Sequence, residues 1–322
     1  MRTLKLVAVQ LAISIALALV ALAALEAYLR LTIPGSSRES IYEYTLSTKR
    51  YKVMKPNATV VAWGKELRTN ELGFRDATPR LPPKHPGEFR IVVLGDSFTV
   101  SAGVDYARIY TTLLEQRLKE KHPGVRVINL AVGGYNVVQY AAVLEEVALG
   151  LEPDMVLVAL YPENDFSMDT YEENFRIASG DSAAPDVPWV QSLYTYRAYL
   201  GKVVNRFGRK DLPKAQTNKG WDENIAALRA IARTTEEHDL PLAVIALPST
   251  WSLASQRPLF QRVEAECARL PNARCYTLLE PLIASGINEA TLRLNALDAH
   301  PNDKYNAFVA EQLAPFVAKF LN

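Results

Sequence analysis

Residues able to carry out acyl transfer occur at two places in this chain. The segment GDSFTV begins directly after an apolar run and places Ser97 where a strand would turn into a helix. The segment LDAHPND, near the end of the chain, contains Asp298 and His300. A serine hydroxyl attacks an ester when a histidine removes its proton and a carboxylate orients that histidine. These residue types predict a covalent acyl-enzyme, with Ser97 as nucleophile, His300 as base and Asp298 as orienting carboxylate.

His300 is favoured as the base over the other histidines of the chain. Those lie in segments that the sequence marks as solvated surface: His85, His122 and His238. Pro301 favours an extended backbone at His300, in which side chains two residues apart project to the same side, so Asp298 can reach the imidazole. The alternative is a capping turn before the last helix, which Asn302 or Asp303 could supply without any role for His300. In the catalytic interpretation, too, we expect Asp303 to cap that helix.

Groups that could bind an oxyanion follow two further apolar runs. The run VINL leads to Gly133 and Gly134, where glycine lets the backbone approach a ligand closely. The run VLVAL leads to Asn164, whose side-chain amide can donate a hydrogen bond. Each motif alone is a common turn or cap, as is the neighbouring Asp96, which we interpret as structural. Their order, after successive apolar runs, favours a catalytic site with possible donors of hydrogen bonds to a developing oxyanion.

Buried strands must position these residues, because the chemistry follows apolar runs. Five such runs are expected to be strands: Phe89 to Leu94, Val125 to Leu130, Met155 to Leu160, Leu242 to Leu247 and Arg274 to Leu278. Amphipathic stretches between and after them predict helices, the last with its apolar face at spacings of three and four residues. This alternation predicts a three-layer, doubly wound α/β fold with a mostly parallel five-stranded sheet. Ligands bind such sheets at the carboxyl ends of the strands, where the candidate residues lie.

The N-terminus contains a segment long and apolar enough to cross a membrane as a helix. Residues from Leu6 to Leu25 include no charged side chain, and Arg2 and Lys5 precede them. The positive-inside rule then predicts a single-pass anchor in the inner (cytoplasmic) membrane, with the rest of the chain periplasmic or otherwise outside the cytoplasm. A cleaved signal peptide is the alternative, and the length of the apolar segment favours the uncleaved anchor.

Composition argues against several other function classes. The 36 Lys and Arg residues almost balance the 35 Asp and Glu residues, which gives no electrostatic reason to expect nucleic-acid binding. Two cysteines and four histidines are too few for a Cys-rich zinc site. We expect neither a metal nor an organic cofactor. Cys267 and Cys275 allow at most one disulfide, which export would permit, and the sequence leaves its formation open.

Together these blocks resemble those of the SGNH or GDSL hydrolases. The resemblance rests on GDSFTVSAGV with Ser97, NLAVGGYN with Gly134 and YPENDF with Asn164, and it covers roughly residues 68 to 318. It implies the flavodoxin-like SGNH fold and an oxyanion hole formed by the Ser97 and Gly134 amides and the Asn164 side chain. The element TNELGFRD is similar to the stretch that precedes the first block in membrane-anchored bacterial members.

Two departures from the family pattern concern the last two blocks. Pro162 and Glu163 stand before Asn164 where the family often has glycine. Asp298 precedes His300 by two residues where the family usually has three, a shorter spacing that resembles some relatives acting on O-acetyl groups of exopolysaccharides. The assignment of Asp298 therefore depends on this segment being extended.

We expect three parts along the chain. Residues 1–30 form the transmembrane anchor, residues 31–88 a Pro-rich extended leader with short strands, and residues 89–322 the SGNH hydrolase domain. Within that domain the strand–helix alternation lapses over residues 166–219, which we interpret as an insertion near the site.

The function expected from these features is a serine esterase that removes small acyl groups, acetyl among them, from envelope or exported glycans. An O-acyltransferase acting on an exported polysaccharide would use the same acyl-enzyme and differ only in the second nucleophile. A catalytically decayed, membrane-tethered glycan-binding module is the third alternative. The expected partners are an acyl-ester substrate and the membrane, and the protein is expected to be a monomer.

Overall fold

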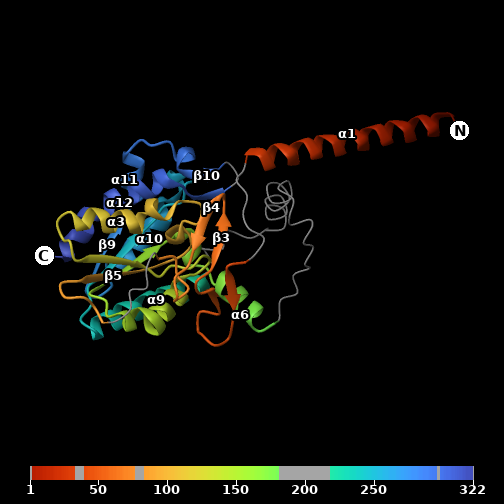
Figure 1. Ribbon diagram of the computed structural model, residues 1–322. Helices are drawn as coiled ribbons and strands as arrows, with labels where there is room; N and C mark the ends of the chain where they lie inside the picture. Colours follow the sequence, from red (N-terminus) through yellow and green to blue (C-terminus); the bar gives the residue numbers. More distant parts are fainter. Residues whose placement is uncertain (1, 33–39, 77–82, 181–217, 296–297, 322) are drawn as a thin grey trace. The chain divides into compact units, whose positions relative to one another are not determined.

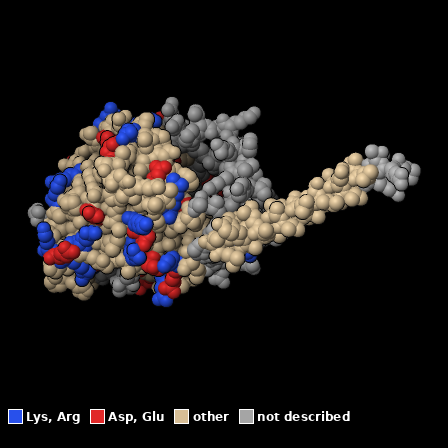
Figure 2. Space-filling model, turned by 90° about the horizontal axis from the view of Figure 1, so that it is seen from above, with Lys and Arg blue, Asp and Glu red and all other residues tan. Residues whose placement is uncertain are grey.

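The computed structural model describes residues 2–32, 40–76, 83–180, 218–295 and 298–321. It divides into two compact units, residues 1–35 with 183–212 and residues 36–182 with 213–322. Of the first unit, the described part is helix α1 (Arg2–Thr32). Its segment Leu6–Thr32 is long and apolar enough to span a membrane, and an 18-residue stretch within it has a mean hydropathy of 2.6. Figure 2 shows this helix with almost no charged side chains, whereas positive and negative side chains intermingle on the other unit.

The second unit is built around a five-stranded sheet (Figure 1). Its strands are β5 (Phe89–Gly95), β6 (Val125–Asn129), β7 (Met155–Leu160), β8 (Leu242–Ala246) and β9 (Ala273–Thr277). They lie in the order β6-β5-β7-β8-β9, and every neighbouring pair is parallel. Strands β7 and β8 are buried along their whole length, as continuous apolar runs covered on both faces require. The predicted doubly wound fold is confirmed, with a sheet that is entirely parallel.

Helices cover both faces of this sheet. Helices α3 (Tyr110–Lys119) and α12 (Asp303–Val317) pack together on one face, and α9 (Asn218–Glu237) lies on the other (Figure 1). Helix α4 (Val137–Val143) packs on α9, and α10 (Arg257–Cys267) joins α9 through the Arg229–Glu266 ion pair. Right-handed crossovers require this division, because the chain runs in one direction from β5 to β6 and in the opposite direction from β6 to β9.

The leader contributes to the core of the same unit. Strands β1 (Tyr42–Tyr44) and β2 (Lys52–Met54) form one hairpin, and β3 (Thr59–Ala62) and β4 (Lys65–Arg68) form another. Four leader side chains belong to the core around the sheet: Ile41, Met54, Leu67 and Phe74. The short strands expected here are present. The leader packs against the sheet and its helices through these side chains.

Part of the proposed insertion falls outside the described residues. Helices α5 (Pro162–Asp165) and α6 (Asp169–Ala178) follow β7, and residues 181–217 are not among those described. After β9, α11 (Leu279–Ala284) leads to a hairpin of β10 (Arg293–Asn295) and β11 (Asp298–Pro301), which carries the C-terminal motif.

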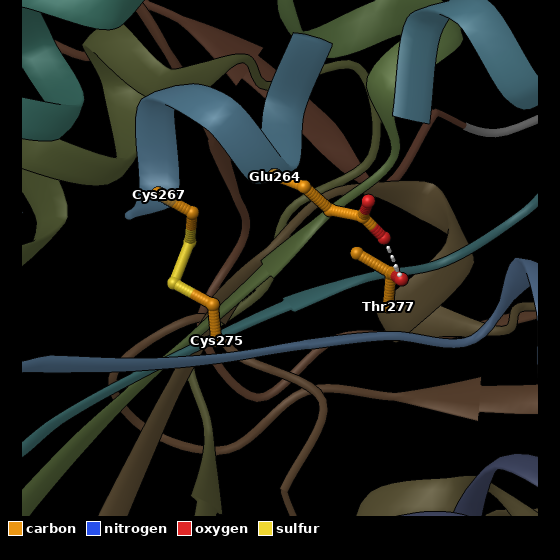
Figure 3. Close-up of a disulfide and its surroundings, with 4 residues drawn as sticks. All are labelled: Glu264, Cys267, Cys275 and Thr277. Carbon is orange, nitrogen blue, oxygen red and sulfur yellow. Dashed lines mark hydrogen bonds between the residues drawn. A yellow bond between two sulfur atoms is a disulfide. The ribbon is translucent and has the colours of Figure 1, made fainter. Parts of the chain in front are cut away.

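The two cysteines form a disulfide that joins α10 to β9 (Figure 3). Cys267 ends the helix, and Cys275 lies in the middle of the strand that forms one edge of the sheet. Beside the disulfide, the Thr277 hydroxyl donates a hydrogen bond to Glu264 of the same helix (Figure 3). The possibility left open by the sequence is therefore settled in favour of one intramolecular disulfide.

Candidate active site

Ser97 lies at the carboxyl end of β5, the strand between β6 and β7. It is the first residue of the short helix α2 (Ser97–Val100), and Asp96 caps this helix by accepting a hydrogen bond from the Phe98 amide at 2.8 Å. Asp96 is buried, and burial raises its pKa to about 6, against the opposing effects of the Phe98 amide and the charge of His300. The structural interpretation of Asp96 agrees with this cap.

A line of hydrogen bonds joins Ser97 to His300 and Asp298. The Oγ atom of Ser97 lies 3.0 Å from Nε2 of His300, and Nδ1 of His300 lies 2.6 Å from Oδ1 of Asp298. The same carboxylate oxygen accepts the backbone amide of His300 at 2.8 Å. Both residues belong to β11, where side chains two residues apart share a side. The two-residue spacing thus brings the carboxylate onto the imidazole, because the segment is extended.

The electrostatics of His300 match this arrangement. Packing around the imidazole lowers its pKa, but the hydrogen bond to Asp298 and the charges of Asp298 and Asp96 outweigh that effect, so the pKa lies above its ordinary value of 6.5. The His300 side chain is still 42% exposed, which leaves room for a substrate beside the ring. A base with a raised pKa that remains accessible suits proton transfer near neutral pH.

Neighbouring side chains fix the orientation of this line. The Phe98 ring lies between those of Tyr161, with centroids 3.9 Å apart, and His300, at 5.8 Å. The hydroxyl of Thr250 donates to the carbonyl of Ala299 at 2.9 Å, which holds β11 from the loop after β8. Sequence reasoning did not single out these residues, since aromatic and hydroxyl side chains in loops have no distinctive spacing.

The segment that contains Gly133 and Gly134, the glycine segment, runs beside Ser97. The Val132 amide donates to the Gly95 carbonyl at 3.1 Å, so the chain after β6 continues along the end of β5. A Cβ atom on Gly133 would lie 3.7 Å from Cβ of Ser97. Gly134 has a φ of 77°, a conformation that glycine adopts without strain. The backbone conformation therefore favours glycine at Gly134, and Gly133 lies beside Ser97.

Asn164 reaches the glycine segment from the other side. It lies in α5, and its Nδ2 donates a long hydrogen bond of 3.4 Å to the carbonyl of Tyr135. The buried Asp165 holds this turn by accepting hydrogen bonds from the Tyr161 amide and the Tyr140 hydroxyl. The structure thus brings Ser97, Gly134 and Asn164 to one end of the sheet.

One predicted role is wrong in its detail. Asn302, and not Asp303, is the N-cap of α12, since its side chain accepts the amides of Lys304 and Tyr305. Asp303 accepts a hydrogen bond from the adjacent Lys304 amide and forms an ion pair of 2.7 Å with Arg108 on the surface. The backbone turns one residue earlier than the sequence suggested, so the cap position shifts by one.

Among the described residues, no group of three or more His, Cys, Asp or Glu side chains could hold a metal ion. The site as described consists of a hydroxyl, an imidazole, a carboxylate and backbone or amide donors. This set of groups can perform nucleophilic acyl transfer.

The chain is similar to known proteins in two of three comparisons. The family model described as the GDSL-like lipase/acylhydrolase family matches residues 93–308. A search of curated proteins found no match. Among solved structures, TesA is 16% identical, with a TM-score of 0.45, covering 72% of this chain and 99% of its own. The esterase EstA from Pseudoalteromonas sp. is 14% identical, with a TM-score of 0.45 and coverages of 73% and 100%. The acetylxylan esterase Axe2 from Geobacillus stearothermophilus is 16% identical, with a TM-score of 0.45 and coverages of 72% and 94%.

Proposed function

Because the chain belongs to the GDSL-like lipase/acylhydrolase family and is a carboxylic ester hydrolase, we propose that it cleaves small acyl esters with Ser97, His300 and Asp298 as its catalytic residues. The observation that supports these assignments is the line of hydrogen bonds from Ser97 Oγ through His300 to Asp298, at 3.0 and 2.6 Å. Each of the three groups has the partner that its role requires.

In this mechanism Ser97 attacks the ester carbonyl while Nε2 of His300 removes the serine proton. Asp298 accepts a hydrogen bond from the Nδ1–H group of His300, which keeps the imidazole in the tautomer that can act as base and then stabilises the imidazolium. His300 returns the proton to the leaving alcohol, and an acyl-serine remains. Water, activated by the same histidine, then releases the acid and restores Ser97.

The developing oxyanion would be bound by the Ser97 and Gly134 amides and the Asn164 side chain. Support comes from the path of the glycine segment beside Ser97 and from the contact between Asn164 and Tyr135. A preorganised donor of this kind is typically worth about 3 kcal/mol in the transition state, so each contributes substantially to the rate.

We further propose that the acyl group is small, acetyl being the simplest, and that the ester belongs to an envelope or exported glycan. The reason is location: α1 would anchor the protein in the cytoplasmic membrane with its N-terminus inside, since Arg2 and Lys5 precede the apolar segment. The Cys267–Cys275 disulfide supports a catalytic unit outside the cytoplasm, because disulfides persist in oxidising compartments. Reporters fused to the C-terminus test this topology, and activity only of the cytoplasmic reporter would contradict it.

The decisive experiment on the chemistry uses the full-length protein in detergent. Ser97→Ala should abolish hydrolysis of p-nitrophenyl acetate and labelling by a fluorophosphonate, with an unchanged thermal midpoint. Retained turnover in this variant would reject the assignment of Ser97. A panel of esters with acyl chains of increasing length then tests the small acyl group, and preference for long chains would contradict it.

The transferase alternative uses the same residues and is resolved by the products. Wild-type protein is incubated with an acyl donor, with and without a polysaccharide acceptor. Free acid in both reactions indicates an esterase. Acylated acceptor at the expense of free acid would identify an acyltransferase instead.

A further inference from the structure

Lys52 of the leader is buried beside the glycine segment. It lies on β2, it is 9% exposed, and its Nζ donates a hydrogen bond of 2.7 Å to the carbonyl oxygen of Gly133. Removing an ammonium group from water costs several kcal/mol unless good partners replace the lost hydration, so a buried lysine needs a reason. Its partner is a carbonyl of the glycine segment, which contains the proposed oxyanion donor Gly134, so the contact suggests a role at the site.

The bonded carbonyl is part of the peptide group that supplies the Gly134 amide. The C=O of Gly133 and the N–H of Gly134 belong to one planar unit, and in a trans peptide they point in opposite directions. A donor held on the oxygen therefore fixes the direction of the N–H. A positive charge on the oxygen also polarises the peptide, and hydrogen bonds in such a chain strengthen one another.

We propose that Lys52 is a positioning residue for the oxyanion hole, which holds and polarises the Gly133–Gly134 peptide so that the Gly134 amide binds the oxyanion more strongly. The inference rests on the proposed function, in which that amide is a donor. Lys52 acts through the peptide and does not itself contact the substrate.

The surroundings of Lys52 hold its ammonium in this position. Its Nζ lies 4.2 Å from the centroid of the Tyr42 ring, which gives a cation–π contact. The Tyr135 hydroxyl donates to the carbonyl of Lys52, so the glycine segment also grips the backbone of β2. Further along the hairpin, the side chain of Gln139 donates to the carbonyl of Arg50 at 2.7 Å. The leader hairpin and the glycine segment are thus joined by hydrogen bonds in both directions.

The charge of Lys52 should depend on pH within the working range of an esterase. Burial lowers its pKa from 10.5 to about 8, and the negative charge of Glu173 on α6 opposes this shift. Tyr42 stays neutral here, because burial raises its pKa to about 12, with smaller contributions from Tyr44 and Asp96. Below pH 8 the ammonium polarises the peptide, and above pH 8 a neutral amine does so less strongly.

The test measures p-nitrophenyl acetate hydrolysis by full-length Lys52→Met, Lys49→Met and Ser97→Ala proteins in detergent. Loss of one oxyanion donor costs about 100-fold or more in kcat, and weakening a donor should cost less, about tenfold. We therefore expect Lys52→Met to lower kcat about tenfold, because it weakens one oxyanion donor, and to leave KM within about twofold of wild type. The fall of wild-type kcat above pH 8 should be absent from this variant. Lys49 is a matched control on the same hairpin, between β1 and β2. Its exposed side chain pairs with Glu145 of the helical segment Leu144–Ala148, and its variant should behave as wild type.

Lys52→Gln provides a second variant should Lys52→Met fail to fold, as circular dichroism would reveal. Glutamine retains an N–H donor but no charge, so kcat should fall less while the limb above pH 8 still disappears. An unchanged kcat, a change in KM alone, or persistence of that limb in a folded variant would overturn the proposal. Ser97→Ala separates the two ideas: turnover in that variant rejects the proposed function, whereas an inactive Ser97→Ala beside fully active Lys52 variants rejects only the role of Lys52.

Discussion

The hydroxyl of Tyr42 and the Cβ of Ser97 flank Gly133. A Cβ atom added to this glycine would lie 2.4 Å from the Tyr42 hydroxyl oxygen and 3.7 Å from Ser97 Cβ. Tyr42 of the leader and Ser97 thus both border the space that a side chain at position 133 would enter. The surroundings of Ser97 are therefore formed in part by the leader, which precedes the first strand of the sheet.

Gly133→Ala should reduce activity and stability together. The added methyl group would collide with the Tyr42 side chain, which is packed in place, and overpacking of this kind costs about 1–3 kcal/mol. Displacement of Tyr42 should also disturb the peptide bonded to Lys52. Ester hydrolysis and thermal unfolding are the measurements. Gly150→Ala is the control, because nothing lies within 4 Å of its added Cβ, and equal behaviour of the two variants would contradict the crowding described here.

Asp298→Asn should keep the fold and lower kcat by up to about four orders of magnitude, as the wrong imidazole tautomer does in serine-protease triads. Asp303→Asn should leave kcat unchanged, since it removes only a partly exposed ion pair with Arg108, worth about 0–1 kcal/mol. Asn302→Ala should lower stability by about 1 kcal/mol through loss of the α12 cap. Activity that survives Asp298→Asn and collapses in Asp303→Asn would show that the wrong carboxylate has been assigned.

The acidic limb of the pH–rate profile should follow His300. The base must be neutral, so kcat/KM should rise as pH increases through a pKa above 6.5. Asp298→Asn removes the negative charge that helps to raise this pKa, while burial still lowers it, so the limb should move to lower pH. NMR titration of the His300 ring in Ser97→Ala, with and without Asp298→Asn, measures the pKa directly. A shift to higher pH on neutralising Asp298 would contradict the electrostatic account.

Loss of the disulfide should weaken the fold without changing the chemistry. Cys267 and Cys275 are separated by eight residues, and closing so short a loop is worth about 2–3 kcal/mol in the chain-entropy model. The disulfide joins α10 to the edge strand β9. Strands β7 and β8 separate β9 from β5, the strand that leads to Ser97. The Cys267→Ala/Cys275→Ala protein should unfold at a lower temperature but retain wild-type kcat at temperatures where it is folded. A fall in kcat of the folded protein would link the edge strand to the site.

Sequence patterns were sufficient for the sheet and for the hydrogen-bonded line at its end. Continuous apolar runs predict buried parallel strands, and β7 and β8 are buried at every position. Pro301 correctly indicated the extended backbone that brings Asp298 onto His300. The individual strands and the Asp298–His300 contact depend on residues close in sequence, so the sequence alone reveals them.

The contribution of the leader could not be predicted in the same way. Strands β1 and β2 have three residues each, too few for a period of hydrophobicity to appear. Lysine is usually a surface residue, so the sequence gives no sign that Lys52 is buried. Its burial depends on packing against Gly133, which is distant in sequence. The choice of Asn302 over Asp303 as cap likewise depends on backbone angles that residue type alone does not fix.

The hydrogen bond between Ser97 and His300 joins positions 203 residues apart. During synthesis Ser97 therefore emerges long before His300, and a chain that ends between Ser97 and β11 contains the proposed nucleophile without its proposed base. Proteolytic loss of the C-terminal hairpin would have the same effect. The proposed mechanism therefore predicts that N-terminal fragments without β11 do not cleave esters.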